Sequence, residues 1–185
     1  MINKMKIFFI VSISVIVSCN TSNKNVIDQH SIFGEFLYDF EELLEQRYGL
    51  QHENDLFRKF IQENNEAYPS LICLENIDNL FKYLYADSLW IPIDQKNEDV
   101  VYFLNFDGWF CDYMDELAVV ESWIAEYRDN VCSAKDISPS SVVLVLEHAE
   151  NLDLKNERIR FFIAIHFFSL MLDKGCLDNY PLIQP

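Results

Sequence analysis

The chain has 185 residues, half of them hydrophobic, so it can bury the core of one domain without the support of metals or disulfides. Its 30 acidic and 14 basic residues give a net charge of −16, which argues against nucleic-acid binding, because such binding depends on neutralising phosphates. The chain has only four glycines, which argues against Gly-rich phosphate loops and turn-rich β-sandwiches.

Residues 1–18 have the parts of a secretory signal. Lys4 and Lys6 supply a positive start, and residues 7–17 form an apolar run that is too short to span a bilayer. Because these two lysines are the only charges before Cys19, their removal leaves 12 basic residues against 30 acidic ones, a net charge of about −18. The segment is therefore expected to direct export and to be absent from the mature protein.

The end of this segment, Ile16-Val17-Ser18-Cys19, resembles the lipobox of bacterial lipoproteins. The resemblance implies that the Cys19 thiol receives a diacylglyceryl group, that cleavage occurs before Cys19, and that the new amino terminus is acylated by a fatty acid such as palmitate. Asn20 follows in place of the Asp that often retains such proteins at the inner membrane, so the resemblance implies the outer membrane, facing the periplasm. Residues 19–30 are expected to be the lipidated cysteine and a flexible tether.

Three helices are predicted before residue 90. Ser31 can cap a first helix over residues 32–48, and Gly49 is a typical stop. The second helix is expected over residues 53–67 and the third over residues 76–89. The first is the most regular, because its apolar residues recur at steps of three and four on one face: Phe33, Phe36, Leu37, Phe40, Leu43 and Leu44.

The middle of the chain contains one ambiguous segment and one long helical pattern. Residues 100–106 could form a strand or the start of a helix, because seven residues are too few for periodicity to decide. From Phe106 to Val131, apolar residues recur at alternating steps of four and three. This pattern predicts one helix over residues 109–132, with Asp107 as its cap. We interpret the seam as the core face of a bundle rather than of a coiled coil, because charge pairing beside it is not evident.

Two further helices are predicted in the last third. Ser138 and Pro139 favour a helix start, and that helix extends to about residue 150, although residues 141–146 could also form a strand. Asp153 is the predicted cap of a final helix over residues 154–174, whose core is apolar on nearly all sides and is therefore expected at the centre of the fold. The predicted fold is all-α, a compact bundle of about six helices in one domain over residues 31–185, and the alternative is α+β with a small sheet.

Four cysteines follow Cys19, and an oxidising envelope would allow them to form disulfides. If residues 109–132 form one helix, Cys111 and Cys132 lie about 32 Å apart and cannot bond to each other. Cys73 and Cys176 would then each pair with one of them. The alternative is four buried free thiols.

No motif nominates a catalytic, metal or cofactor site. His166 lies in the apolar core of the last helix, where a buried structural histidine is expected. Glu147 and His148 are adjacent, but neighbouring side chains of a helix point about 100° apart and do not converge on one site. The stretch 151–157 lacks the glycine of a calcium loop and carries Lys155 at a ligand position. We therefore predict no metal and no cofactor.

The strongest functional indication is the acidic surface, which would attract a basic protein. The predicted contact residues are Glu35, Asp39 and Glu42 on the first helix, and Trp109 as an exposed aromatic anchor. We predict a lipid-anchored protein-binding module of the envelope that is not an enzyme, and its most specific form is an immunity protein that neutralises a periplasmic toxin. The alternatives are an envelope hydrolase that uses two carboxylates and a structural lipoprotein of envelope assembly.

Overall fold

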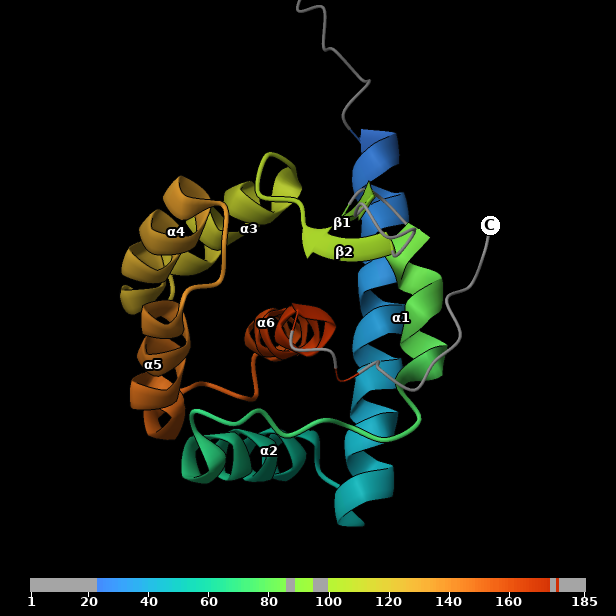
Figure 1. The fold of residues 1–185 in the computed structure, drawn as a ribbon, viewed down its shortest axis with the longest axis vertical. Coiled ribbons are helices and arrows are strands. Elements are labelled where there is room, and N and C mark those ends of the chain that lie inside the picture. The colour runs from blue at the N-terminus through green and yellow to red at the C-terminus, as the bar shows by residue number, and fades with distance from the viewer. Residues whose placement is uncertain (1–22, 86–88, 95–99, 174–175, 177–185) are drawn as a thin grey trace, which may run out of the picture.

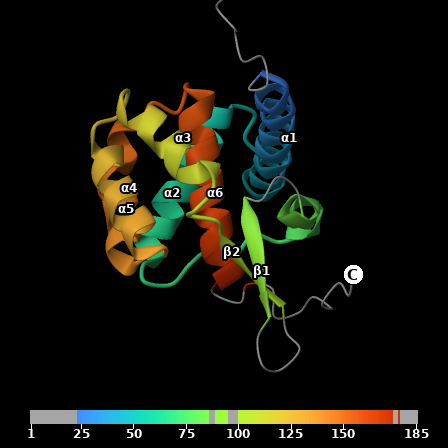
Figure 2. The ribbon, with the colours of Figure 1, turned by 90° about the horizontal axis from the view of Figure 1, so that it is seen from above.

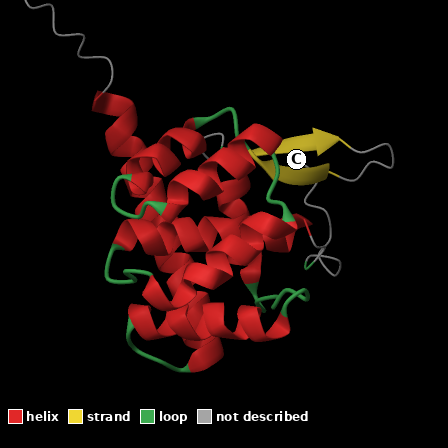
Figure 3. Ribbon diagram, turned by 90° about the vertical axis from the view of Figure 1, so that its left-hand side faces the viewer, coloured by secondary structure: helices red, strands yellow, loops and turns green. Residues whose placement is uncertain are grey.

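The computed structural model describes residues 23–85, 89–94, 100–173 and 176, and the predicted signal, Cys19 and the tail over residues 177–185 lie outside this part. The described elements form a helical fold with one small sheet at its edge (Figure 3). In chain order they are α1 (Asn23–Tyr48), α2 (Glu53–Ala67), the 3₁₀-helix η1 (Ile77–Tyr85), β1 (Trp90–Asp94), β2 (Val100–Leu104), α3 (Trp109–Ala118), α4 (Trp123–Ala134), α5 (Pro139–His148), the 3₁₀-helix η2 (Ala149–Asn151) and α6 (Glu157–Asp173).

Helix α6 is the centre of the fold. Figure 1 shows it nearly end-on with the other elements around it, and Figure 2 shows α1 on one side of it and α4 and α5 on the other. Every residue from Phe161 to Leu172 is buried, which confirms that this helix, apolar on all sides, is central. No helix in the described part of the chain is both long and apolar enough to cross a membrane.

Helix α6 begins three residues later than predicted. The Asn156 side chain accepts a hydrogen bond from the Arg158 backbone N–H at 3.0 Å, as the cap of a helix does. Asp153 instead accepts from the Lys155 N–H within the preceding turn, at 3.2 Å. The cap is therefore Asn156 and not Asp153, because the intervening residues bond to one another as turns.

Helix α1 packs its apolar face against α6. Phe36 and Phe40 are buried, and the Phe36 ring lies 5.6 Å from that of Phe168. The helix ends as predicted at Gly49, which has a φ of +64° and donates its N–H to the Glu45 carbonyl oxygen at 2.7 Å. It begins at Asn23, however, so Ser31 lies inside it. Residues 23–30, for which a tether was predicted, are part of this helix.

Strands β1 and β2 form an antiparallel pair in which Trp90 faces Leu104 and Pro92 faces Tyr102. The ambiguous segment is therefore a strand, and the predicted third helix is the shorter η1. Pro92 is tolerated because a two-stranded sheet leaves each strand with a free edge that needs no N–H donor. Trp90 belongs to the core, where its indole N–H donates to the Ser169 hydroxyl at 3.0 Å.

The prediction of one helix over residues 109–132 was wrong. The chain turns between α3 and α4, and the N–H groups of Val120 and Glu121 both donate to the Leu117 carbonyl oxygen. The turn contains no Gly or Pro, and its flanking residues Val119 and Ser122 keep right-handed helical backbone angles. Val119 at this turn is 88% exposed. The result is a hairpin of two helices rather than one rod.

Helix α5 forms as predicted. Ser138 is its cap and accepts a hydrogen bond from the Ser141 N–H at 3.4 Å, and Pro139 occupies the first turn. The strand alternative for residues 141–146 was therefore wrong. Helix α5 follows the hairpin and lies beside α4 (Figure 1).

Candidate functional site

Two of the three carboxylates predicted to contact a partner are free to do so. Glu35 and Glu42 are exposed and form no hydrogen bond or ion pair with another described residue. Asp39 instead accepts from the Tyr83 hydroxyl at 2.8 Å and pairs with the Lys82 ammonium at 2.7 Å. Asp39 therefore ties α1 to η1, and sequence reasoning could not foresee this because its partners lie more than 40 residues away.

The exposed part of α1 also presents an aromatic ring. Tyr38 is 66% exposed and lies three residues after Glu35 and four before Glu42, spacings that put all three side chains on one side of a helix. We call Glu35, Tyr38 and Glu42 the acidic face. The acidic face therefore presents one large, accessible ring between two carboxylates that have no partner in the described part of the chain.

Trp109 is not the exposed anchor that was predicted. Its ring lies 4.3 Å from that of Phe33 and 6.3 Å from that of Phe161, so it packs between α1 and α6. Its indole nitrogen is buried and has no hydrogen-bond partner in the described part of the protein. The turn at Gly108 directs the first residues of α3 toward the core, and Trp109 is therefore a packing residue.

All four cysteines that follow Cys19 form disulfides. Cys73 bonds to Cys176, and Cys111 bonds to Cys132 with a Cα–Cα distance of 6.2 Å. The predicted pairing and the alternative of four free thiols were both wrong. The first error follows from the missed hairpin, which brings the start of α3 to the end of α4.

The buried His166 packs as a core residue and has one polar partner that the sequence did not reveal. The His166 Nδ1 and the Tyr127 hydroxyl lie 2.8 Å apart, and both residues are fully buried. Burial lowers the pKa of His166 to about 3 and raises that of Tyr127. The imidazole is therefore neutral and shares one hydrogen bond with the tyrosine hydroxyl through Nδ1, whereas Nε2 has no partner among the described groups.

Glu147 and His148 do not form a joint site. The His148 ring stacks on Trp123 with 4.8 Å between centroids. Glu147 is exposed and instead lines a surface hollow between α5 and α2. In the described part of the chain, no group of three or more His, Cys, Asp or Glu side chains could hold a metal ion.

The ion pair between Glu41 and Arg160 is the most buried one among the described residues, and it stabilises the packing of two helices. Glu41 on α1 pairs with Arg160 on α6 at 2.8 Å, and each side chain is about one-sixth exposed. Burial raises the pKa of Glu41, although Arg160 opposes this shift. The pair joins α1 to α6, and Glu41 is not among the residues that line the two hollows around Tyr68.

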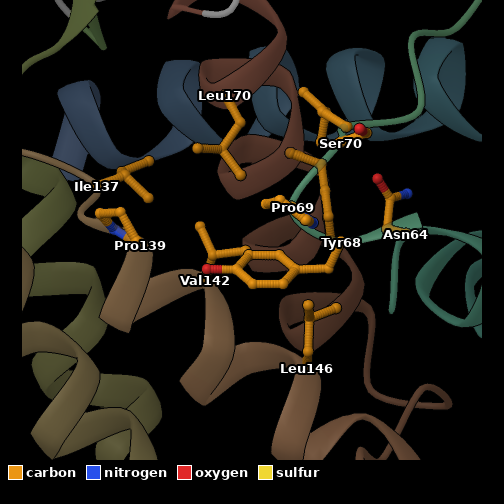
Figure 4. Close-up of a pocket in the computed structure, with 11 residues that line it drawn as sticks. Asn64, Tyr68, Pro69, Ser70, Ile137, Pro139, Val142, Leu146 and Leu170 are labelled. Atoms are coloured by element: carbon orange, nitrogen blue, oxygen red, sulfur yellow. The ribbon is translucent and has the colours of Figure 1, made fainter. Parts of the chain in front are cut away.

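A small apolar cavity lies where α2, α5 and α6 meet. It has a volume of about 110 Å³, and Figure 4 shows the Tyr68 ring reaching across its mouth toward Val142, with Leu170 on the opposite side from Leu146. The full lining consists of Asn64, Tyr68, Pro69, Ser70, Leu71, Ile137, Pro139, Val142, Leu146, Phe167 and Leu170. We call it the Tyr68 cavity.

A wider and shallower hollow adjoins this cavity and shares Tyr68 and Leu146 with it. Its volume is about 810 Å³, and we call it the polar shelf. It is lined also by Arg58, Gln62, Asn65, Val143, Glu147, Ala149 and Glu150. Sequence reasoning missed both hollows, because their residues come from segments separated by up to about 100 positions in the chain.

Comparison with family models, with curated proteins and with solved structures finds no match for this chain.

Proposed function

We propose that the chain is a lipid-anchored, acidic protein-binding module of the bacterial envelope, and that the acidic face binds a basic protein. The observation that carries the proposal is Tyr38, which is 66% exposed between two carboxylates that no described cation neutralises. Exposed aromatic rings are frequent anchors of protein interfaces. Charge of one sign around the ring would speed the encounter with a partner of opposite sign.

The most specific form of this proposal is an immunity protein that neutralises a toxin delivered into the periplasm. A net charge of about −18 after signal removal would attract a basic toxin and cover a positively charged active site. The lipobox resemblance at Cys19 supports an anchor at the membrane where such a toxin arrives.

A capture experiment tests the proposal. The soluble part from Asn20 onward is used as bait for lysate and secreted material of the producing bacterium, at low and at moderate salt, and the retained proteins are identified by mass spectrometry. The triple variant Glu35→Gln/Tyr38→Ala/Glu42→Gln is compared with Glu75→Gln/Glu126→Gln, which removes two exposed charges elsewhere on the surface.

We expect one basic partner at near one-to-one stoichiometry. The triple variant should bind it at least about tenfold more weakly, whereas the control should bind like the wild type. Toxin activity in that partner would support the immunity form, and a stable envelope complex would instead support a role in assembly. Absence of any stable partner at either salt concentration would contradict the proposal.

A further inference from the structure

One wall of the Tyr68 cavity, formed by the residues after Tyr68, is held in place before any ligand arrives. The buried Asn64 side chain donates to the Phe60 carbonyl oxygen at 2.9 Å and accepts from the Ile72 N–H at 3.1 Å, which holds the wall after Tyr68 against α2. The disulfide between Cys73 and Cys176 fastens the next residues of the same wall. A preformed hollow binds with little ordering cost.

The size and lining of the cavity define what can enter it. Apart from the Asn64 side chain, whose groups are already bonded, and Ser70 at the exposed edge, the cavity is lined by aliphatic and aromatic side chains such as Leu71, Val142 and Phe167. An apolar cavity of about 150 Å³ accommodates benzene, so a volume of about 110 Å³ suits one branched aliphatic side chain. Tyr68 is 40% exposed and offers an aromatic edge at the mouth (Figure 4).

The polar shelf next to the cavity offers groups of a different kind. Glu147 is exposed and makes no ion pair with any residue that the structure describes. Asn65 is exposed too, and its amide, which can both donate and accept, has no described partner. Arg58, the one cation of the shelf, donates to the Glu150 carbonyl oxygen at 3.5 Å. The shelf therefore offers two carboxylates that are unpaired in the described part of the chain, those of Glu147 and Glu150, and a free amide beside the apolar hollow.

We propose that this groove, the Tyr68 cavity together with the polar shelf, binds a peptide segment of the partner protein. A Leu or Ile side chain of that segment fills the cavity, and a Lys or Arg close to it in sequence pairs with Glu147. The Asn65 amide meets the main chain of the segment. The inference rests on the proposed protein-binding function and adds a second contact, at which the recognised feature is a branched aliphatic residue with a basic neighbour.

A peptide selection tests this inference. A phage-displayed library of random twelve-residue peptides is selected on the purified mature protein, and the enriched peptides are then measured by titration against variants. Val142→Phe fills the cavity, and Val119→Phe is the matched control at the exposed α3–α4 turn. If Val142→Phe lowers the thermal midpoint, Ser70→Phe at the exposed edge of the same cavity replaces it.

We expect a consensus that contains Leu or Ile together with Lys or Arg. Binding should weaken at least about tenfold in Val142→Phe, as expected for the loss of one buried aliphatic side chain, and should weaken also in Glu147→Gln. Val119→Phe should bind like the wild type.

Three results would overturn the inference. The first is a set of peptides that bind Val142→Phe as tightly as the wild type, and the second is a selection that enriches no peptide. The third is self-association of the protein that Val142→Phe abolishes, since a second copy would then occupy the groove. Peptides that lose binding only when Glu35, Tyr38 and Glu42 are replaced would overturn this inference and leave the proposed function standing.

Discussion

The buried His166 predicts that the protein loses stability as the pH falls from 7 to 5. Burial lowers the pKa of this histidine to about 3, whereas a histidine of the unfolded chain titrates at about 6.5. Between these values the unfolded chain binds a proton that the folded protein excludes, so the free energy of unfolding decreases with falling pH. The decrease approaches about 1.4 kcal/mol per pH unit, which gives about 2 kcal/mol between pH 7 and pH 5.

Urea denaturation at both pH values measures this loss. In the variant His166→Gln the side chain does not titrate, but its amide oxygen can still accept from the Tyr127 hydroxyl. Its free energy of unfolding should therefore fall by about 2 kcal/mol less than that of the wild type over the same pH range. Carboxylates that titrate in this range are common to both proteins and cancel in the comparison.

Tyr127→Phe is the matched control for this experiment. It removes the hydrogen bond to Nδ1 but keeps His166 buried among aromatic rings, so it should retain most of the pH dependence of the wild type. An equal loss of stability in the wild type and in His166→Gln would refute the reasoning, because it would mean that His166 gains a proton in the folded protein as readily as in the unfolded chain.

Three further predictions concern stability. Replacing both Cys111 and Cys132 with Ser should lower the free energy of unfolding by about 3 kcal/mol, because the bond closes a loop of 21 residues; peptide mapping that joins either cysteine to another partner would refute the pairing. Arg160→Met leaves the Glu41 carboxylate buried without its cation, and should lower the free energy of unfolding in urea by about 3 kcal/mol. Adding Glu41→Gln to the same chain should recover part of this loss. No recovery would mean that the loss comes from the packing of the Arg160 side chain and not from the unpaired charge. Gly49→Ala places a Cβ at a φ of +64° and should cost about 1 kcal/mol; an unchanged thermal midpoint would contradict a required left-handed residue.

The helices whose boundaries the sequence marks clearly were predicted well. Ser138 with Pro139 and the glycine at position 49 are local signals, because a cap or a left-handed residue acts within a few positions of itself. The all-apolar core of α6 is a signal of a different kind, since a helix without a polar face can only be surrounded by other elements. For this reason the central position of α6 could be predicted from the sequence.

The α3–α4 hairpin shows where periodicity stops being informative. Val119 and Ser122 keep helical backbone angles at the ends of the turn, so the steps of four and three continue across it while the helix axis changes direction. Because the turn contains no Gly or Pro, the sequence does not indicate that the helix ends there. The wrong cysteine pairing followed directly from the single rod, because that rod would keep Cys111 and Cys132 far apart.

The candidate contact surfaces were only partly predictable. Exposure of Glu35 and Glu42 follows from the polar side of an amphipathic helix, and the same pattern could not reveal that Asp39 is bound by Lys82 and Tyr83. The Tyr68 cavity requires knowledge of how α2, α5 and α6 pack, which local patterns do not contain. Surfaces on one helix can be inferred from sequence, whereas hollows between helices cannot.

Crosslinking from position 38 in the producing bacterium tests whether the acidic face contacts a basic protein. Tyr38 is replaced by the photoreactive residue p-benzoylphenylalanine, which has a similar shape, and the same replacement at the exposed Glu75 serves as the control. We expect one dominant crosslinked product from position 38, which contains a basic protein and is absent from the control. No product at position 38, or the same products from both positions, would contradict a protein contact at the acidic face.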